Sequence, residues 1–205
     1  MKIIKIVANK FARFYIFVIR GTPMMVQSLI FYYAIFNLFK RTGMSVTEIN
    51  RVWSLFISGL VTVSLNSTAY LAEVLRGGIL AVDAGQMEAA RSLGMTHWQA
   101  MRRVVFPQAI KNSLPAIGNE FIINIKDSSV LCVLGVSDLM FMTRSVAGIY
   151  YKGTECYLIA ATVYLFLTYL SSLLLKAITG RMTAPDNTKR RQGNQTVDLG
   201  LPSSN

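Results

Sequence analysis

Three stretches of this chain are long, apolar and uncharged, and they restrict its fold more than any other feature. Residues 21–39, 52–72 and 157–175 contain no Asp, Glu, Lys or Arg. Each is long enough for a helix to cross the hydrocarbon core of a bilayer, which takes about 17–25 residues. Hydrophobic residues make up 53% of the chain and charged residues only 15%, which is too apolar a balance for an ordinary soluble domain. The sequence therefore predicts an all-α integral membrane protein.

A fourth, less apolar stretch covers residues 110–137. It carries Lys111, Glu120, Lys126 and Asp127, so it must face something polar if it crosses, or else it is re-entrant. We count it as a crossing, which gives a transmembrane domain at 21–180 with spans at about 21–39, 52–75, 110–137 and 155–178. The cytoplasmic loop is then 76–109. Residues 181–205 are polar without apolar periodicity, and we expect a disordered cytoplasmic tail.

The distribution of basic residues predicts the orientation. Lys and Arg number 21 against 10 acidic residues, a net charge of +11. Residues 1–20, 76–111 and 176–205 hold five bases each, whereas 40–51 and 126–154 hold the other six. By the positive-inside rule the first three segments are cytoplasmic, as four spans require. The bases flank apolar spans and do not gather on one folded face, which argues against a nucleic-acid binder.

Cysteine and histidine are too few for several kinds of site. The chain has two cysteines, Cys132 and Cys156, and one histidine, His97. These cannot build a disulfide framework, a zinc site or a His-based catalytic triad. We expect no catalytic residues, no metal and no cofactor. A membrane-embedded enzyme would need a convergent catalytic set, which the acidic residues do not form.

The first 20 residues have a basic and an apolar side on a helical wheel. Two interpretations stay open for this basic amphipathic helix. It is either the cytoplasmic end of a longer bundle helix or an interfacial helix lying on the headgroups. The sequence Arg20-Gly21-Thr22-Pro23 then breaks the helix, with Thr22 as a possible cap and a new helix starting near Pro23.

The loop between the second and third spans contains signals for a helical hairpin. Asp83 and Gln86 have the spacing of a capping box that opens a helix at 86–93, and Gly94 can take the left-handed position after it. Thr96 and Gln99 form a second box before a helix at 98–105, and Pro107 follows. A connector need only be polar, so a folded hairpin indicates a docking element.

The hairpin residues also resemble a known family motif. Glu88-Ala89-Ala90, then Gly94 after three residues, then Val104-x-Phe106-Pro107 after nine, resembles the EAA motif of bacterial ABC-importer permeases. Further segments resemble the polar amino-acid subfamily, which imports histidine, glutamine, arginine and similar solutes. They are residues 20–23, 66–73, 76–79, 85–86, 107–109 and 126–129. The resemblance covers about residues 12–180.

The resemblance implies a permease subunit of the bacterial cytoplasmic membrane that works by alternating access. Such permeases pair as homo- or heterodimers, bind two ABC ATPase subunits through the EAA hairpin and receive solute from an extracytoplasmic binding protein. The chain has no G-x-x-x-x-G-K-[ST] loop, so a partner must hydrolyse the ATP. The ATPase-coupling residues would be Glu88, Ala89, Ala90, Gly94 and Pro107. A channel or scaffold protein would not need this hairpin.

Polar residues within the spans suggest a solute pathway. Thr62, Asn66, Tyr70 and Glu73 share one face of the second span, and Glu120, Asn124 and Asp127 share one face of the third. Charged groups at membrane depth cost at least ~2.5 kcal/mol and normally face a cavity or a partner. We therefore expect the substrate pathway to include Glu120, Asn124, Asn66, Tyr70 and Asp127. Interhelical hydrogen bonding is the alternative for Asn66.

One departure from the family pattern concerns the start of the chain. Family members of this type usually have a further membrane helix before the amphipathic stretch, and the first helix is expected to be missing here. A fragment, a misplaced start or a genuinely short form would all give this pattern. The alternatives to an amino-acid permease are accordingly a truncated or non-transporting subunit, or a permease for another small polar solute such as an opine or cystine.

Overall fold

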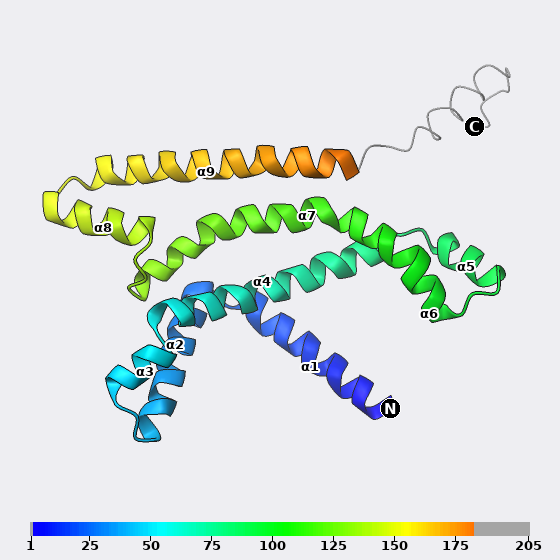
Figure 1. Cartoon of the computed structure of the whole chain (residues 1–205), viewed down its shortest axis with the longest axis horizontal. Coiled ribbons are helices and arrows are strands. Elements are labelled where there is room, and N and C mark those ends of the chain that lie inside the picture. The colour runs from blue at the N-terminus through cyan, green and yellow to red at the C-terminus, as the bar shows by residue number, and fades with distance from the viewer. Residues whose placement is uncertain (1, 183–205) are drawn as a thin grey trace, which may run out of the picture.

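The computed structural model describes residues 2–182, with side chains placed within 6–180; the predicted tail at 183–205 lies outside the described residues. This part of the chain is helical, without strands. Three long helices, α4, α7 and α9, run side by side, and shorter helices gather at their two ends (Figure 1). The bounds of these three are α4 Leu55–Leu80, α7 Phe106–Asp127 and α9 Gly153–Met182.

Two described segments are long and apolar enough to cross a membrane: Val46–Leu80 and Gly153–Gly180. The helices α1 (Lys2–Gly21) and α2 (Met24–Arg41) are long and apolar enough only when they are taken together. If they make one broken span, they add a third crossing. α7 does not qualify by composition, and the fourth crossing stays a prediction. Its 22 residues correspond to about 33 Å of helix, and it lies between α4 and α9.

The antiparallel packing of α4 against α7 is the most extensive in the molecule. Near one end, a Cβ added to Gly78 would overlap the Ser113 hydroxyl and lie 2.7 Å from the Ala109 carbonyl oxygen. Further along, the Asn124 amide donates to the Ser67 hydroxyl at 2.9 Å. The missing side chain of Gly78 therefore lets the two backbones approach, and a polar bond sets their register.

The chain bends by 112° between α1 and α2. The predicted break is confirmed, and Pro23 is the residue that precedes the first turn of α2. Thr22 does not cap the new helix; its hydroxyl donates back to the Val18 carbonyl at 2.8 Å. The side-chain amide of Gln27 donates instead to the Ile19 carbonyl at 2.7 Å and to the Thr22 carbonyl at 2.9 Å. A buried glutamine thus satisfies carbonyls that the end of α1 leaves free.

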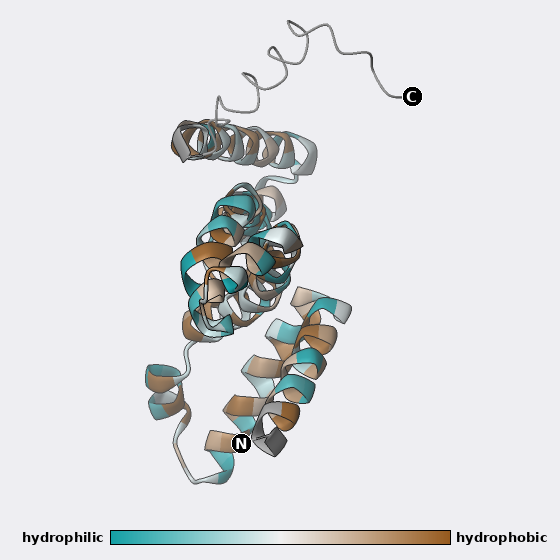
Figure 2. Cartoon of the chain, turned by 90° about the vertical axis from the view of Figure 1, so that its right-hand side faces the viewer, coloured by the Kyte–Doolittle hydropathy of each residue, from teal (hydrophilic) through white to brown (hydrophobic). Residues whose placement is uncertain are grey.

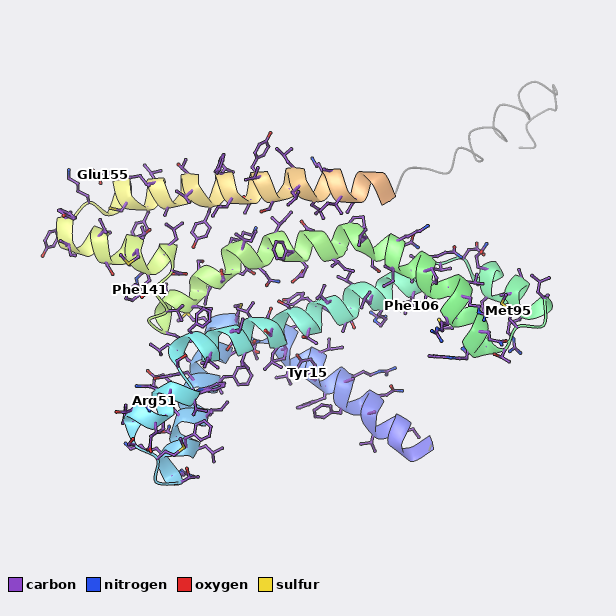
Figure 3. All side chains as sticks on the ribbon, in the orientation of Figure 1. Tyr15, Arg51, Met95, Phe106, Phe141 and Glu155 are labelled. Atoms are coloured by element: carbon purple, nitrogen blue, oxygen red, sulfur yellow. The ribbon has the colours of Figure 1, made fainter. Side chains whose placement is uncertain are left out.

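The chain turns at one end of the long helices through α5 and α6, and at the other end through α3, η2 and α8. These short helices are α3 Val46–Val52, α5 Ala84–Ser92, α6 His97–Ala100, the π-helix η1 Met101–Val105, the 3₁₀-helix η2 Ser128–Val133 and α8 Leu139–Tyr150. In Figure 3, Met95 lies at one end of the molecule, whereas Arg51, Phe141 and Glu155 lie at the other. The predicted cytoplasmic loop at 76–109 therefore lies at the opposite end of the long helices from the predicted external segments.

Candidate coupling hairpin and solute pathway

The hairpin turn forms through backbone hydrogen bonds that Gly94 makes possible. Gly94 has φ +82°, its N–H donates to the Arg91 carbonyl, and the Met95 N–H donates to the Ala90 carbonyl at 3.2 Å. This is the two-bond arrangement that closes many helices after a left-handed residue. The predicted role of Gly94 in the turn is therefore confirmed.

The two predicted capping boxes have different outcomes. Thr96 and Gln99 make both bonds of a box, so the second prediction is confirmed. At the first, Asp83 caps α5 by accepting from the Gly85 N–H at 2.7 Å. The other half of a box, in which the Asp83 N–H donates to the Gln86 side-chain oxygen, is not found among the described residues. The side-chain oxygen of Gln86 instead accepts from the side-chain amide of Gln108 at 3.2 Å. The prediction of a reciprocal box was wrong because a residue 22 positions away takes that side chain.

The second arm of the hairpin does not stop at Pro107. α6, η1 and α7 follow one another without a break from His97 to Asp127. In a regular helix the proline ring would clash with the carbonyl four residues earlier, here that of Arg103. That carbonyl lies in the π-turn, which ends with a bond from the Phe106 N–H to the Met101 carbonyl. The wider turn accommodates the proline, so the arm joins α7 directly.

The face of the hairpin tip is exposed and carries the motif residues. Glu88 and Ala89 are exposed, whereas Ala90 is buried against the second arm. Both ion pairs found within the described residues belong to Glu73, so neither takes the Glu88 carboxylate. Two large apolar side chains are exposed on the same hairpin, Leu93 at 81% and Trp98 at 71%. A charge beside apolar side chains on a rigid turn is suited to binding another protein.

The polar stripe of α4 faces α1 and α2. The Asn66 amide donates to the Gln27 side-chain oxygen at 3.3 Å. The Arg20 guanidinium lies 5.1 Å above the centre of the Tyr70 ring and 3.6 Å from a carboxylate oxygen of Glu73. Arg76 bonds the same carboxylate at 2.7 Å. Asn66, Tyr70 and Glu73 of this stripe thus have partners on neighbouring helices, whereas the Thr62 hydroxyl donates to the Ser58 carbonyl of α4 itself.

The polar residues of α7 do not merge with that stripe into one cluster. Asn124 bonds Ser67 on a different side of α4, and Asp127 is exposed at the end of α7. Glu120 is half-buried and lies within electrostatic reach of both Asp127 and Arg20. Arg20 thus contacts the α4 stripe at Tyr70 and Glu73, and its charge also acts on Glu120 of α7.

Sequence reasoning missed Arg20 and Gln27 as site residues. It counted Arg20 among the cytoplasmic bases, although the base lies next to the helix break that places it against α4. Gln27 stands within an uncharged run, and a glutamine there was a signal that it satisfies something buried. Within residues 2–182 the structure shows no group of three or more acidic, His or Cys side chains able to hold a metal ion.

Packed helices with apolar, exposed outer faces and a capped hairpin at one end define a multi-pass α-helical membrane protein. The family model described as "Binding-protein-dependent transport system inner membrane component" matches residues 4–184. The chain therefore belongs to this family of inner membrane transport components, and it lies in the cytoplasmic membrane as a transport subunit.

Relatives and a solved structure are similar over most of the chain. The glutamine transport system permease protein GlnP of Escherichia coli (strain K12) is 34% identical over 176 residues, which is 86% of this chain and 76% of the relative. The probable amino-acid permease protein YxeN of Bacillus subtilis (strain 168) is 37% identical over 182 residues, 89% of this chain and 78% of the relative. A crystal structure of an amino acid ABC transporter with histidines superposes with a TM-score of 0.73 at 45% identity, covering 88% of this chain and 78% of that chain.

Proposed function

We propose that this chain is the permease subunit of an ATP-driven importer that moves polar amino acids across the cytoplasmic membrane by alternating access. The observation that carries the proposal is the 45% identity, over 88% of the chain, to a component of an amino acid ABC transporter. A second permease copy or paralogue, two ABC ATPase subunits and an extracytoplasmic solute-binding protein complete the transporter.

The hairpin is the element that couples the permease to the ATPase. Glu88 presents a carboxylate without an ion-pair partner on the described chain to a base on the ATPase, and the small Ala89 allows a helix of the partner to approach closely. Ala90, Gly94 and Pro107 act indirectly, since they hold the turn and the junction with α7. Because the second arm is continuous with α7, a displacement of the hairpin is transmitted along that helix into the membrane.

The solute pathway runs past Glu120, with Asn124, Asn66, Tyr70 and Asp127 as further contributors. Glu120 supplies a carboxylate for the amino group of the solute. Asn66 and Asn124 each use an amide hydrogen between helices here and retain their side-chain oxygens as acceptors. Tyr70 is stacked against Arg20, so a solute reaches its ring only if α1 and α4 separate during the transport cycle.

ATP-driven uptake by the reconstituted transporter tests the function. The permease, its ATPase and its binding protein are placed in liposomes, and uptake of labelled glutamine, histidine and arginine is measured with and without ATP. Glu88→Lys should weaken retention of the ATPase subunit during purification, whereas the same change at Glu155, an exposed acid at the opposite end, should leave it unchanged. Uptake that does not depend on ATP, or equal retention in both variants, would contradict the proposal.

A second solute class is favoured by one comparison. The nopaline transport system permease protein NocM of Agrobacterium fabrum (strain C58) is 34% identical over 173 residues, 82% of this chain and 70% of the relative. An opine keeps the zwitterionic amino-acid group and adds at least one further carboxylate. Uptake of labelled arginine is measured with an excess of unlabelled nopaline or of unlabelled arginine, and the stronger competitor distinguishes the two substrate classes.

A further inference from the structure

A basic pocket lies between α1 and α4, apart from the hairpin. Its volume is about 460 Å³, and it is open to the outside of the molecule. The polar part of the lining comes from Arg13, Arg20, Tyr70 and Glu73, and the apolar part from Ile16 and Phe17. The Tyr15 hydroxyl donates to the Leu65 carbonyl at 2.6 Å and holds this part of α1 on α4.

The cations of the pocket are incompletely neutralised. Its one lining carboxylate, Glu73, bonds Arg76 through three contacts of 2.7–3.2 Å. Arg20 is farther from that carboxylate, at 3.6 Å, and neither ion pair of the described residues includes Arg13. Glu120 also acts on Arg20 from outside the lining. The guanidinium groups of Arg13 and Arg20 therefore keep donors for an anion with several acceptor oxygens.

Apolar side chains continue the surface away from the pocket. Phe11, Phe14 and Phe17 on α1 are 70%, 66% and 75% exposed, and the turns of α1 next to the N label in Figure 2 carry both hydrophobic and hydrophilic residues. A polar amino acid would leave these rings uncovered, whereas a lipid acyl chain would cover them. An amphipathic ligand with an anionic head fits both parts of the surface.

The depth of the pocket agrees with such a ligand. α4 has 26 residues and is about 39 Å long, roughly 9 Å more than the hydrocarbon core. Glu73 lies seven residues, about 10 Å, before the Leu80 end, which is the cytoplasmic end in the predicted orientation. Arginines at this level extend toward the headgroups, and basic pockets between membrane helices on this side bind anionic headgroups.

We propose that the pocket between α1 and α4 binds an anionic phospholipid of the inner leaflet, with its phosphate held by Arg13 and Arg20 and an acyl chain lying on the phenylalanines of α1. The site fixes the bent α1–α2 segment to the surrounding bilayer. It is separate from the coupling hairpin and does not depend on which solute is transported.

Native mass spectrometry of the purified full chain in detergent tests this site. Dioleoyl phosphatidylglycerol and dioleoyl phosphatidylcholine are titrated separately, and their retention is compared. The wild type should prefer phosphatidylglycerol, and Arg13→Gln should lose about fivefold of that preference, which corresponds to ~1 kcal/mol for one base near the surface. Arg13→Lys should retain most of it. Arg103→Gln is the control, since it removes an exposed base outside the pocket.

Four outcomes would overturn the proposal. Equal losses in Arg13→Gln and Arg103→Gln would show non-specific attraction to the net charge. Displacement of the lipid by millimolar inorganic phosphate would identify a site for free anions. The wild type could show no preferred lipid while Arg13→Gln changes from dimer to monomer. That result would assign this face to a second copy of the chain. Circular dichroism of each variant separates loss of binding from loss of the helical fold. If Arg13→Gln does not fold, the test rests on Arg13→Lys, and loss of its preference for phosphatidylglycerol overturns the proposal.

Discussion

Replacement of Gly94 by valine should uncouple the hairpin through backbone conformation alone. Gly94 has φ +82°, and no atom beyond its two chain neighbours lies within 4 Å of the position that a Cβ would take. A Cβ at this position therefore meets no residue from elsewhere in the fold. What it changes is the cost of the left-handed conformation, which is roughly 1–2 kcal/mol for an ordinary L-residue and is least favourable for a β-branched one.

The strain is relieved most simply at the end of α5. The bonds from Gly94 N–H to the Arg91 carbonyl and from Met95 N–H to the Ala90 carbonyl depend on the turn. Their loss would displace Glu88 and Ala89 from the positions that we propose for docking. If the strain of 1–2 kcal/mol appears wholly as lost affinity, the ATPase subunit should bind about 5–30-fold more weakly.

The assay is retention of the ATPase subunit on the tagged permease, followed by ATP-driven uptake in proteoliposomes. Gly94→Asn should keep most of the affinity for the ATPase subunit that Gly94→Val loses, because asparagine tolerates the left-handed region. Gly77→Ala is a matched control: it also has free space around it, but it lies within regular helix α4, where alanine is preferred. Wild-type retention and uptake in Gly94→Val would refute the reasoning, and equal damage by Asn and Val would exclude backbone conformation as the cause.

The remaining predictions concern orientation, solute binding and packing. Cysteines introduced at Gln99 and Ser45 should label from opposite sides of the membrane, and labelling of both from outside would overturn the topology. Glu120→Gln should lower uptake of a cationic or zwitterionic amino acid roughly tenfold, at ~1.4 kcal/mol per decade, with little change in ATPase stimulation; normal transport with lost dimer assembly would make the residue structural. Gly78→Ala should destabilise the fold by about 1–3 kcal/mol in thermal unfolding, because its Cβ would overlap Ser113, whereas Gly77→Ala should not.

Much of the hairpin could be predicted because its signals are local. Gly94 lies after a short helical pattern, and Thr96 has its capping partner only three residues away. The same reasoning could have found α3, where Ser45 and Glu48 form a capping box that was overlooked. It failed at Asp83 and Gln86, where Gln108 competes for the Gln86 side chain. Local patterns are dependable only where no distant group competes for the same atoms.

By itself the sequence determined that the chain is helical, that it lies in a membrane and that it carries a motif-bearing hairpin. These conclusions depend on features that residues near one another in the sequence define: the length of the uncharged stretches, the capping residues, and the spacing of the motif from Glu88 to Pro107. Only the tertiary structure decided that Arg20 meets Glu73 and Tyr70, that Gln27 meets Asn66, and that Asn124 meets Ser67. These pairs are 39 to 57 residues apart, and their meeting depends on the bend after α1 and on the close approach at Gly78. Helical periodicity gives the face on which a side chain lies, but the rotation and register of packed helices determine which partner it finds.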